Sequence, residues 1–304
     1  MTNINKIVIA LCEGPHDTAF LYRVLRSDCY RLFSDEIDKL PNVVTQFIKQ
    51  GYRKIDTLES LKLDALRNYN IPNKILYKGH TLVLLYAMGG DSEKMENSKR
   101  LALINEYTST LMSSNDDVKE FNPFDEDGFS TNQVEYSFLF FYDADEDASK
   151  QIKKSNDYLK ELEIEEKLTH NQYIRNENIN YGCFIFSEDG TKGALENIMF
   201  KVIEIEENKT LLDDAKKYFE HIQDNRYKRK RSINYSGDNS CEEVSKKKKQ
   251  AKVYEKKSIL GIMGQLQNSG SSNVVTIEHS DYIKLEKGSI PTSIQEIIEF
   301  FAKA

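Results

Sequence analysis

The 304-residue sequence lacks the features that would assign it to several common classes of protein. No apolar run approaches the roughly 18 residues that a membrane-spanning helix needs. The four cysteines form no Cys-x-x-Cys pair, which argues against a cysteine zinc site and against a disulfide scaffold. The first residues show no apolar block typical of a secretory signal, and no P-loop motif occurs. These absences predict a cytoplasmic protein with reduced thiols and no membrane contact.

Charge is unevenly distributed along the chain. The formal net charge is −7, but residues 226–257 contain 12 Lys and Arg against 4 Asp and Glu. The rest of the chain contains 30 basic and 45 acidic residues. This distribution suits carboxylates gathered for metal binding and a separate cationic segment that contacts phosphates. A solvated acidic surface with a flexible basic loop is the simpler alternative.

Four short apolar runs are typical of strands that are buried on both faces of a parallel sheet. They are Lys6–Leu11, Thr81–Met88, Tyr136–Tyr142 and Gly182–Phe186. A helical pattern follows each run, over Pro15–Phe33, Glu93–Met112, Ala148–Leu168 and Lys192–Ile205. Repeated alternation of strand and helix predicts an α/β fold with a doubly wound, mainly parallel sheet.

The remaining segments define the expected domain organisation. We expect a first domain over residues 1–205 and a C-terminal extension over 206–304. Within them we expect a helical insert at 34–80, an acidic loop at 113–134, a mobile basic stretch at 224–257 and a docking helix at Ser293–Phe301. The insert could form a dimer surface, a partner-docking surface or a lid, so a homodimer is one expectation.

Acidic residues follow the first strand, where parallel sheets form their sites. Glu13 comes directly after this strand, and a carboxylate there is an unusual structural choice. Gly14 permits a tight turn, and Pro15 is well placed to begin the next helix. Asp17 lies in the first helical turn, so it is either a ligand or a residue that stabilises the helix end.

A second acidic group follows the third strand. Asp143 and Asp145 would point to the same side of an extended chain, whereas Asp147 is assigned as the N-cap of the next helix. Bringing Glu13 to this pair would be repulsive without a cation, because all three carboxylates are ionised at neutral pH. All-oxygen ligation selects Mg²⁺ or Mn²⁺, as one ion or as two.

These motifs resemble the Toprim domain of topoisomerases, primases and overcoming-lysogenisation-defect nucleases. One strand ends in Glu-Gly-x-x-Asp and a later strand ends in Asp-x-Asp, and the resemblance spans residues 6–205. The matching positions are Glu13, Gly14, Asp17, Asp143 and Asp145. The resemblance implies a Toprim-like fold and a metal site that includes all four of these acidic residues.

A later segment resembles small stand-alone Toprim-like nucleases. In Phe184–Glu196 a strand is followed by a glycine turn and a Gly-x-Leu-Glu helix start. This similarity implies that Glu196 is a further metal ligand, although a first-turn glutamate also stabilises any helix. Lys257 looks like the lysine with which related nucleases stabilise transition-state charge.

The resemblance therefore implies a metal-dependent endonuclease that hydrolyses phosphodiester bonds. The chain has no space for the tyrosine-bearing domain of a topoisomerase and no cysteine pairs for a primase. The expected catalytic residues are Glu13, Asp143, Asp145 and Lys257. Glu13, Asp143 and Asp145 would hold the metal, and one carboxylate, with Glu13 the first candidate, could instead act as general base. The basic stretch would contact the nucleic-acid backbone through Arg229, Arg231, Lys247 and Lys248.

Several alternatives stay open from the sequence. Nothing separates a DNA substrate from a structured RNA such as tRNA. A stand-alone Toprim protein could be the nuclease effector of an antiviral defence system, acting with a separate ABC-type ATPase. A non-catalytic Toprim scaffold or regulatory module is the alternative outside the enzymes.

Overall fold

A computed structural model of the protein describes most of the chain. The described residues are 4–56, 71–89, 99–109, 134–176, 178–221, 231–235, 241–245, 255–286 and 290–304. The chain divides into two compact units, one formed by residues 1–195 and 286–304 and the other by residues 196–285. The first unit thus ends before the expected boundary at 205. It also includes the C-terminal helix, which the sequence had assigned to an extension.

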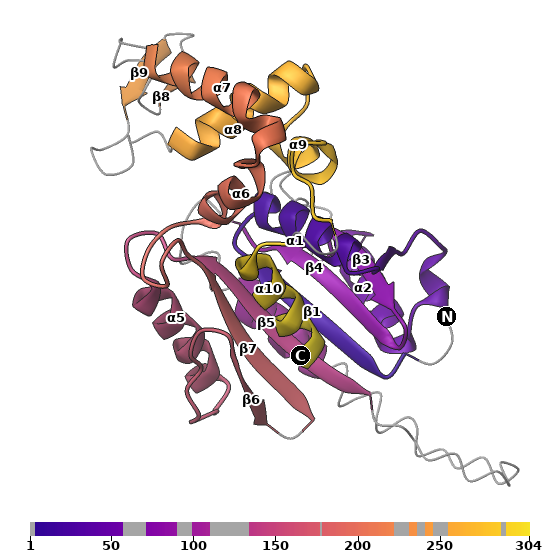
Figure 1. Ribbon diagram of the computed structural model, residues 1–304. Helices are drawn as coiled ribbons and strands as arrows, with labels where there is room; N and C mark the ends of the chain where they lie inside the picture. Colours follow the sequence, from indigo (N-terminus) through magenta and orange to yellow (C-terminus); the bar gives the residue numbers. More distant parts are fainter. Residues whose placement is uncertain are drawn as a thin grey trace, which may run out of the picture. The chain divides into compact units, whose positions relative to one another are not determined.

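The four strands expected from the apolar runs form the centre of the first unit (Figure 1). They are β1 (Lys6–Cys12), β4 (Thr81–Ala87), β5 (Glu135–Asp143) and β7 (Ile179–Phe186). Their order is β4-β1-β5-β7, and each adjacent pair is parallel. Their central residues are buried, which is why their sequences are continuously apolar. The predicted α/β class with a mainly parallel sheet centre is confirmed.

Antiparallel strands at both edges make the seven-stranded sheet mixed. On one side β3 (Lys74–Lys78) pairs with β4, and β2 (Arg31–Leu32) pairs with β3. On the other side β6 (Gln172–Asn176) pairs with β7. The sequence did not predict these strands, because they are short and only partly buried.

Two predicted helical segments are corrected by these edge strands. The helix expected over Pro15–Phe33 is α1 (Pro15–Ser27), which ends before Cys29 adopts a left-handed φ of 65° and β2 begins. The insert at 34–80 contains the short helix η1 (Ile37–Lys39) and α2 (Asn42–Asp56), but it ends in β3. Gly79, with a φ of 57°, supplies the tight turn from β3 into β4.

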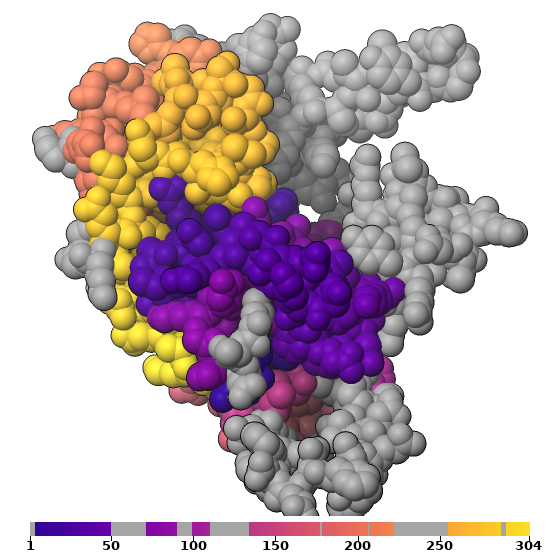
Figure 2. Space-filling view, turned by 90° about the vertical axis from the view of Figure 1, so that its right-hand side faces the viewer, coloured from indigo at the N-terminus to yellow at the C-terminus, as the bar shows by residue number. Residues whose placement is uncertain are grey.

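Helices cover both faces of the sheet. On one face α2, the helical residues 99–109 and α5 (Ala148–Glu161) contribute to a single hydrophobic core. On the other face α10 (Thr292–Lys303) packs its Phe300 and Phe301 rings against Phe141 of β5. α10 also contacts α1, and Figure 2 shows their yellow and indigo atoms side by side. α5 ends earlier than the predicted Leu168, although this leucine is buried in the loop that follows.

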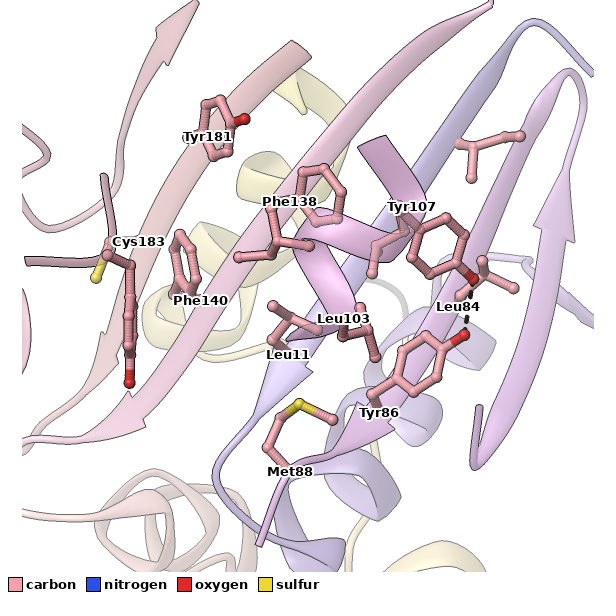
Figure 3. Close-up of a cluster of buried hydrophobic side chains, with 14 of the residues drawn as sticks. Leu11, Leu84, Tyr86, Met88, Leu103, Tyr107, Phe138, Phe140, Tyr181 and Cys183 are labelled. Atoms are coloured by element: carbon pink, nitrogen blue, oxygen red, sulfur yellow. Dashed lines mark hydrogen bonds between the residues drawn. The ribbon is translucent and has the colours of Figure 1, made fainter. Parts of the chain in front are cut away.

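The core on the first face is rich in aromatic rings (Figure 3). Tyr107 stacks on Phe47 of α2 with 3.7 Å between ring centroids, and its hydroxyl lies 2.7 Å from that of Tyr86. The two buried hydroxyls therefore satisfy each other inside an apolar core. Burial raises the pKa of both phenols well above its ordinary value, so they stay protonated at neutral pH.

The second unit is mainly helical. Its elements are α6 (Leu195–Ile203, which begins at the last residue of the first unit), η2 (Glu206–Asn208), α7 (Lys209–His221), β8 (Arg231–Tyr235), β9 (Cys241–Ser245), α8 (Glu255–Gln267) and α9 (Asn273–His279). The basic stretch 224–257, expected to be mobile, contains the antiparallel β8–β9 pair and the first residues of α8. Gly264 lets α8 approach Thr276 of α9 closely.

Two further expectations concern the acidic loop and the absence of membrane-spanning helices. The acidic loop at 113–134 lies outside the described residues except for Val134. Among the helices that the structure describes, none is long and apolar enough to span a bilayer. Cys12, Cys29 and Cys183 carry free thiols.

The docking of α10 predicts a strict size limit at Gly182 of β7. A Cβ at this position would lie 2.6 Å from the Tyr173 ring and 2.9 Å from the Phe300 ring. We expect Gly182→Ala to lower the free energy of unfolding by about 1–3 kcal/mol, measured by urea denaturation. Gly261→Ala is the matched control, because its Cβ would make only an ordinary 3.5 Å contact. Equal stability of the two variants would contradict this packing.

His170 predicts a pH dependence of stability. Its Nδ1 accepts a hydrogen bond from the Ile185 N–H at 3.0 Å, and burial lowers the pKa of the imidazole despite the opposing charge of Glu296. The unfolded chain therefore binds the proton more tightly, and stability should fall as the pH drops below about 6.5. In urea titrations between pH 7.5 and 5, the free energy of unfolding should fall less for His170→Asn than for the wild type. An unchanged loss would exclude His170 as its source.

Candidate functional site

Glu13 and Asp143 come together at the carboxyl edge of the sheet. They follow β1 and end β5, which are parallel neighbours at the sheet centre, with Cys12 opposite Phe141. The Glu13 Oε2 atom accepts a hydrogen bond from the backbone N–H of Asp143 at 3.3 Å. The carboxylate thus takes the place of a backbone acceptor where the β1 chain turns away into α1. This contact confirms that Glu13 lies next to Asp143, whereas the meeting of both with the Asp145 carboxylate stays a prediction.

The Asp143 side chain connects the sheet to a helix start. Its Oδ1 atom accepts a hydrogen bond of 2.7 Å from the backbone N–H of Leu195, the first residue of α6. Helix N-termini carry unsatisfied N–H groups and a partial positive charge, so a carboxylate is favoured there. Asp143 remains half-buried rather than enclosed. It therefore combines a structural hydrogen bond with partial access to solvent.

Asp145 departs from the geometry that the sequence suggested. The expectation that Asp143 and Asp145 point to one side assumed an extended chain, but Asp145 has a left-handed φ of 51°. Its backbone makes a reciprocal pair with Gly193, with N···O distances of 2.7 and 2.8 Å. Its side chain is exposed. The extended geometry assumed for the pair does not hold at Asp145, because the strand ends at Asp143 and the chain turns to meet the loop before α6. The assignment of Asp145 as a metal ligand and catalytic residue stays a prediction.

Asp17 and Asp147 both stabilise helix ends. The Asp17 Oδ2 atom accepts a 2.7 Å hydrogen bond from the Gly14 N–H, and the residue is 5% exposed. This geometry matches the helix-end role that the sequence left open, and its role as a metal ligand stays a prediction. Asp147 caps α5 through Ser149, as expected, and these hydrogen bonds lower the pKa of its carboxyl.

Glu196 and Lys257 form an ion pair within the second unit. The Lys257 Nζ atom lies 3.4 Å from the Glu196 Oε1 atom, and the Glu196 side chain is only 5% exposed. The pair connects the first turn of α6 to α8. Their assignment as metal ligand and catalytic lysine stays a prediction.

The expected nucleic-acid contacts fall largely outside the described part of the chain. Arg229, Lys247 and Lys248 lie outside the described residues. Arg231 is the first residue of β8, where its backbone is in register with Ser245 of β9. Their role in binding a nucleic-acid backbone stays a prediction.

The donor atoms at the sheet edge suit a hard divalent cation. Glu13 and Asp143 offer only carboxylate oxygens, the ligand type that Mg²⁺ and Mn²⁺ prefer. Within the described residues, no group of three or more His, Cys, Asp or Glu side chains is arranged to hold a metal ion. Mg²⁺ is commonly held by one or two protein carboxylates together with substrate phosphates. A cation held by this pair would therefore need a bound substrate to complete its coordination.

Two basic residues near this edge were not singled out from the sequence. Arg100 is fully buried, donates from Nη1 to the Leu11 carbonyl at 2.8 Å, and holds its guanidinium 4.4 Å from the Tyr142 ring centroid. Lys99 donates from Nζ to the Gly89 carbonyl at 3.2 Å. The spacing did contain a signal for Arg100. It shares a helix face with the apolar residues at 103, 104 and 107.

The double role of Glu13 predicts different effects for two substitutions. Glu13→Ala removes the acceptor of the Asp143 N–H and should lower the free energy of unfolding by about 1–3 kcal/mol. Glu13→Gln keeps an acceptor oxygen and should stay within about 0.5 kcal/mol of the wild type. Urea denaturation of both variants checks this. A Glu13→Gln protein as unstable as Glu13→Ala would show that the hydrogen bond is not the stabilising contact.

Comparisons with known proteins identify one family. Searches of curated proteins and of solved structures found no match. A family model described as "Protein of unknown function (DUF3226)" matches residues 8–236, which include most of β1, all of β5 and the candidate site residues Glu13, Asp17, Asp143, Asp145 and Glu196. Because this match covers well over half of the sequence, the chain belongs to the DUF3226 family.

Proposed function

We propose that the protein is a metal-dependent nuclease that hydrolyses phosphodiester bonds at the Glu13–Asp143 site. The observation that carries this proposal is the hydrogen bond from the Asp143 N–H to the Glu13 carboxylate, which holds two acidic residues 130 positions apart at one sheet edge. The resemblance of the two motifs to the Toprim domain supports the same reading. Sites in open parallel sheets form at this edge.

Glu13 and Asp143 would hold Mg²⁺ or Mn²⁺. When bound, the cation would polarise the phosphodiester and offset the negative charge that develops in the transition state. The Asp143 N–H orients the Glu13 carboxylate through Oε2. Glu13 would accept a proton from the attacking water as general base while the water's oxygen bonds to phosphorus. The bond from phosphorus to the leaving ester oxygen then breaks, and that oxygen takes a proton from Glu13 or from solvent. The Leu195 N–H correspondingly orients Asp143 through Oδ1.

A non-catalytic scaffold is the second candidate, and a specific observation favours it. Three of the proposed ligands make structural contacts that need no metal. Asp17 bonds to Gly14, Asp143 bonds to Leu195, and Glu196 pairs with Lys257. A carboxylate kept for helix capping would persist in a protein that had lost its activity. Calorimetric titration with Mn²⁺ separates the two candidates, because a scaffold has no reason to bind the ion.

The proposed activity should depend on the charge of Glu13. The purified chain should nick supercoiled plasmid or cleave total RNA with Mn²⁺ or Mg²⁺, and EDTA should stop the reaction. Glu13→Gln should lower the cleavage rate at least a hundredfold while it keeps the fold, because it retains the hydrogen bond but not the charge. Asp147→Asn is the matched control, since asparagine also caps helices well. Full activity of Glu13→Gln would exclude the proposed mechanism.

The substrate arms of this experiment also address the biological setting. Cleavage of plasmid would favour a DNA endonuclease, and cleavage of RNA alone would favour an RNase. We propose an antiviral nuclease effector that acts with a separate ABC-type ATPase as one such setting. Low activity of the purified chain that rises when the ATPase is added would support that partnership.

A further inference from the structure

Lys99 lies beside the carboxyl edge that holds Glu13. Its Nζ atom donates to the Gly89 carbonyl at 3.2 Å. Gly89 in turn lies against Glu13, because a Cβ on Gly89 would be 3.2 Å from the Glu13 carbonyl oxygen. The adjacent Met88 N–H bonds to the Cys12 carbonyl at 2.9 Å, directly before Glu13. The Lys99 ammonium is therefore anchored on a loop that touches the acidic site.

Arg100 fixes the helix that presents Lys99. The fully buried guanidinium donates to Leu11 of β1 and stacks on Tyr142 of β5. Glu13 lies two residues after Leu11, and Asp143 comes directly after Tyr142. Burying a charged guanidinium costs desolvation free energy, and apolar residues of similar volume often give equal or greater stability. A buried arginine that joins two strand ends therefore points to a positioning role. Its position holds the helix against both strands that carry the acidic pair.

The net negative charge of the first unit means that a polyanionic substrate needs a positively charged side chain at this edge of the sheet. The first unit contains 25 Lys and Arg residues against 35 Asp and Glu, whereas the second contains 17 against 14. A phosphate chain that approaches Glu13 and Asp143 therefore meets a repulsive acidic unit. A half-buried lysine anchored on the Gly89 carbonyl, next to the Glu13 backbone, offsets that repulsion locally.

We infer that Lys99 binds a backbone phosphate of the nucleic acid at the Glu13–Asp143 site. The inference rests on the proposed function. It adds a phosphate contact in the first unit, whereas the sequence predicted contacts with the nucleic-acid backbone only in the basic stretch. Lys99 supplies a point charge without reading a base, so it should act equally on different sequences. Arg100 is a positioning residue that does not touch the phosphate.

The salt dependence of binding tests this inference without cleavage. The full chain is titrated in EDTA with fluorescein-labelled 20-nucleotide DNA and RNA over a series of salt concentrations, and anisotropy gives the affinity. Lys99→Gln should weaken binding about threefold to tenfold and reduce the slope of log affinity against log salt by about 0.7, the value for one lost contact with a single strand. Lys99→Arg should restore the slope.

Lys6→Gln is the matched control. Lys6 also donates from Nζ to a backbone carbonyl, that of Ala302 at 3.3 Å, but it lies at the opposite end of β1. The Lys6→Gln protein should show the same slope of log affinity against log salt as the wild type. A wild-type slope for a folded Lys99→Gln protein would overturn the inference, and so would failure of the wild type to bind either oligonucleotide. Binding without Mn²⁺-dependent cleavage would instead refute the proposed nuclease while leaving the Lys99 contact supported.

Discussion

The hydrogen bond between the Asp143 N–H and the Glu13 carboxylate depends on the parallel pairing of β1 and β5. Parallel strands bring their carboxyl ends to the same edge, and the buried faces of both strands hold their register. A shift of one residue would exchange the side chains between the two covered faces and disrupt their packing against the helices on each side. The geometry of the acidic site is therefore a consequence of core packing.

The same carboxylates serve both the fold and the proposed chemistry. Glu13 completes the hydrogen bonding of a strand end, and Asp143 binds an N–H at the start of α6. Such contacts orient a carboxylate before any cation arrives and limit its freedom to move. The left-handed turn at Asp145 ties the loop before α6 to the same edge. Backbone and side-chain hydrogen bonds thus both fix the chain at the end of β5.

Predictions from the sequence succeeded where burial was uniform. Continuous apolar runs identified the four central strands, and the cap at Asp147 followed from local preference. The edge strands β2, β3 and β6 were missed because they are short and their partly exposed residues show no distinct period. The partner of β2 also lies more than 40 residues away along the chain. Arg100 was missed although it shares a helix face with apolar residues, because its partners, the Leu11 carbonyl and the Tyr142 ring, come from distant strands.

The sequence by itself determined the α/β class, the parallel centre of the sheet and the position of Glu13 and Asp143 at strand ends, because these depend on local hydrophobic patterns and chain order. Only the tertiary structure decided that the Asp145 backbone pairs with Gly193, that Asp143 accepts a hydrogen bond from Leu195, and that Glu196 pairs with Lys257. These outcomes depend on hydrogen bonds and charges between segments. Such contacts form only after the strands and helices have packed, and no local pattern specifies them.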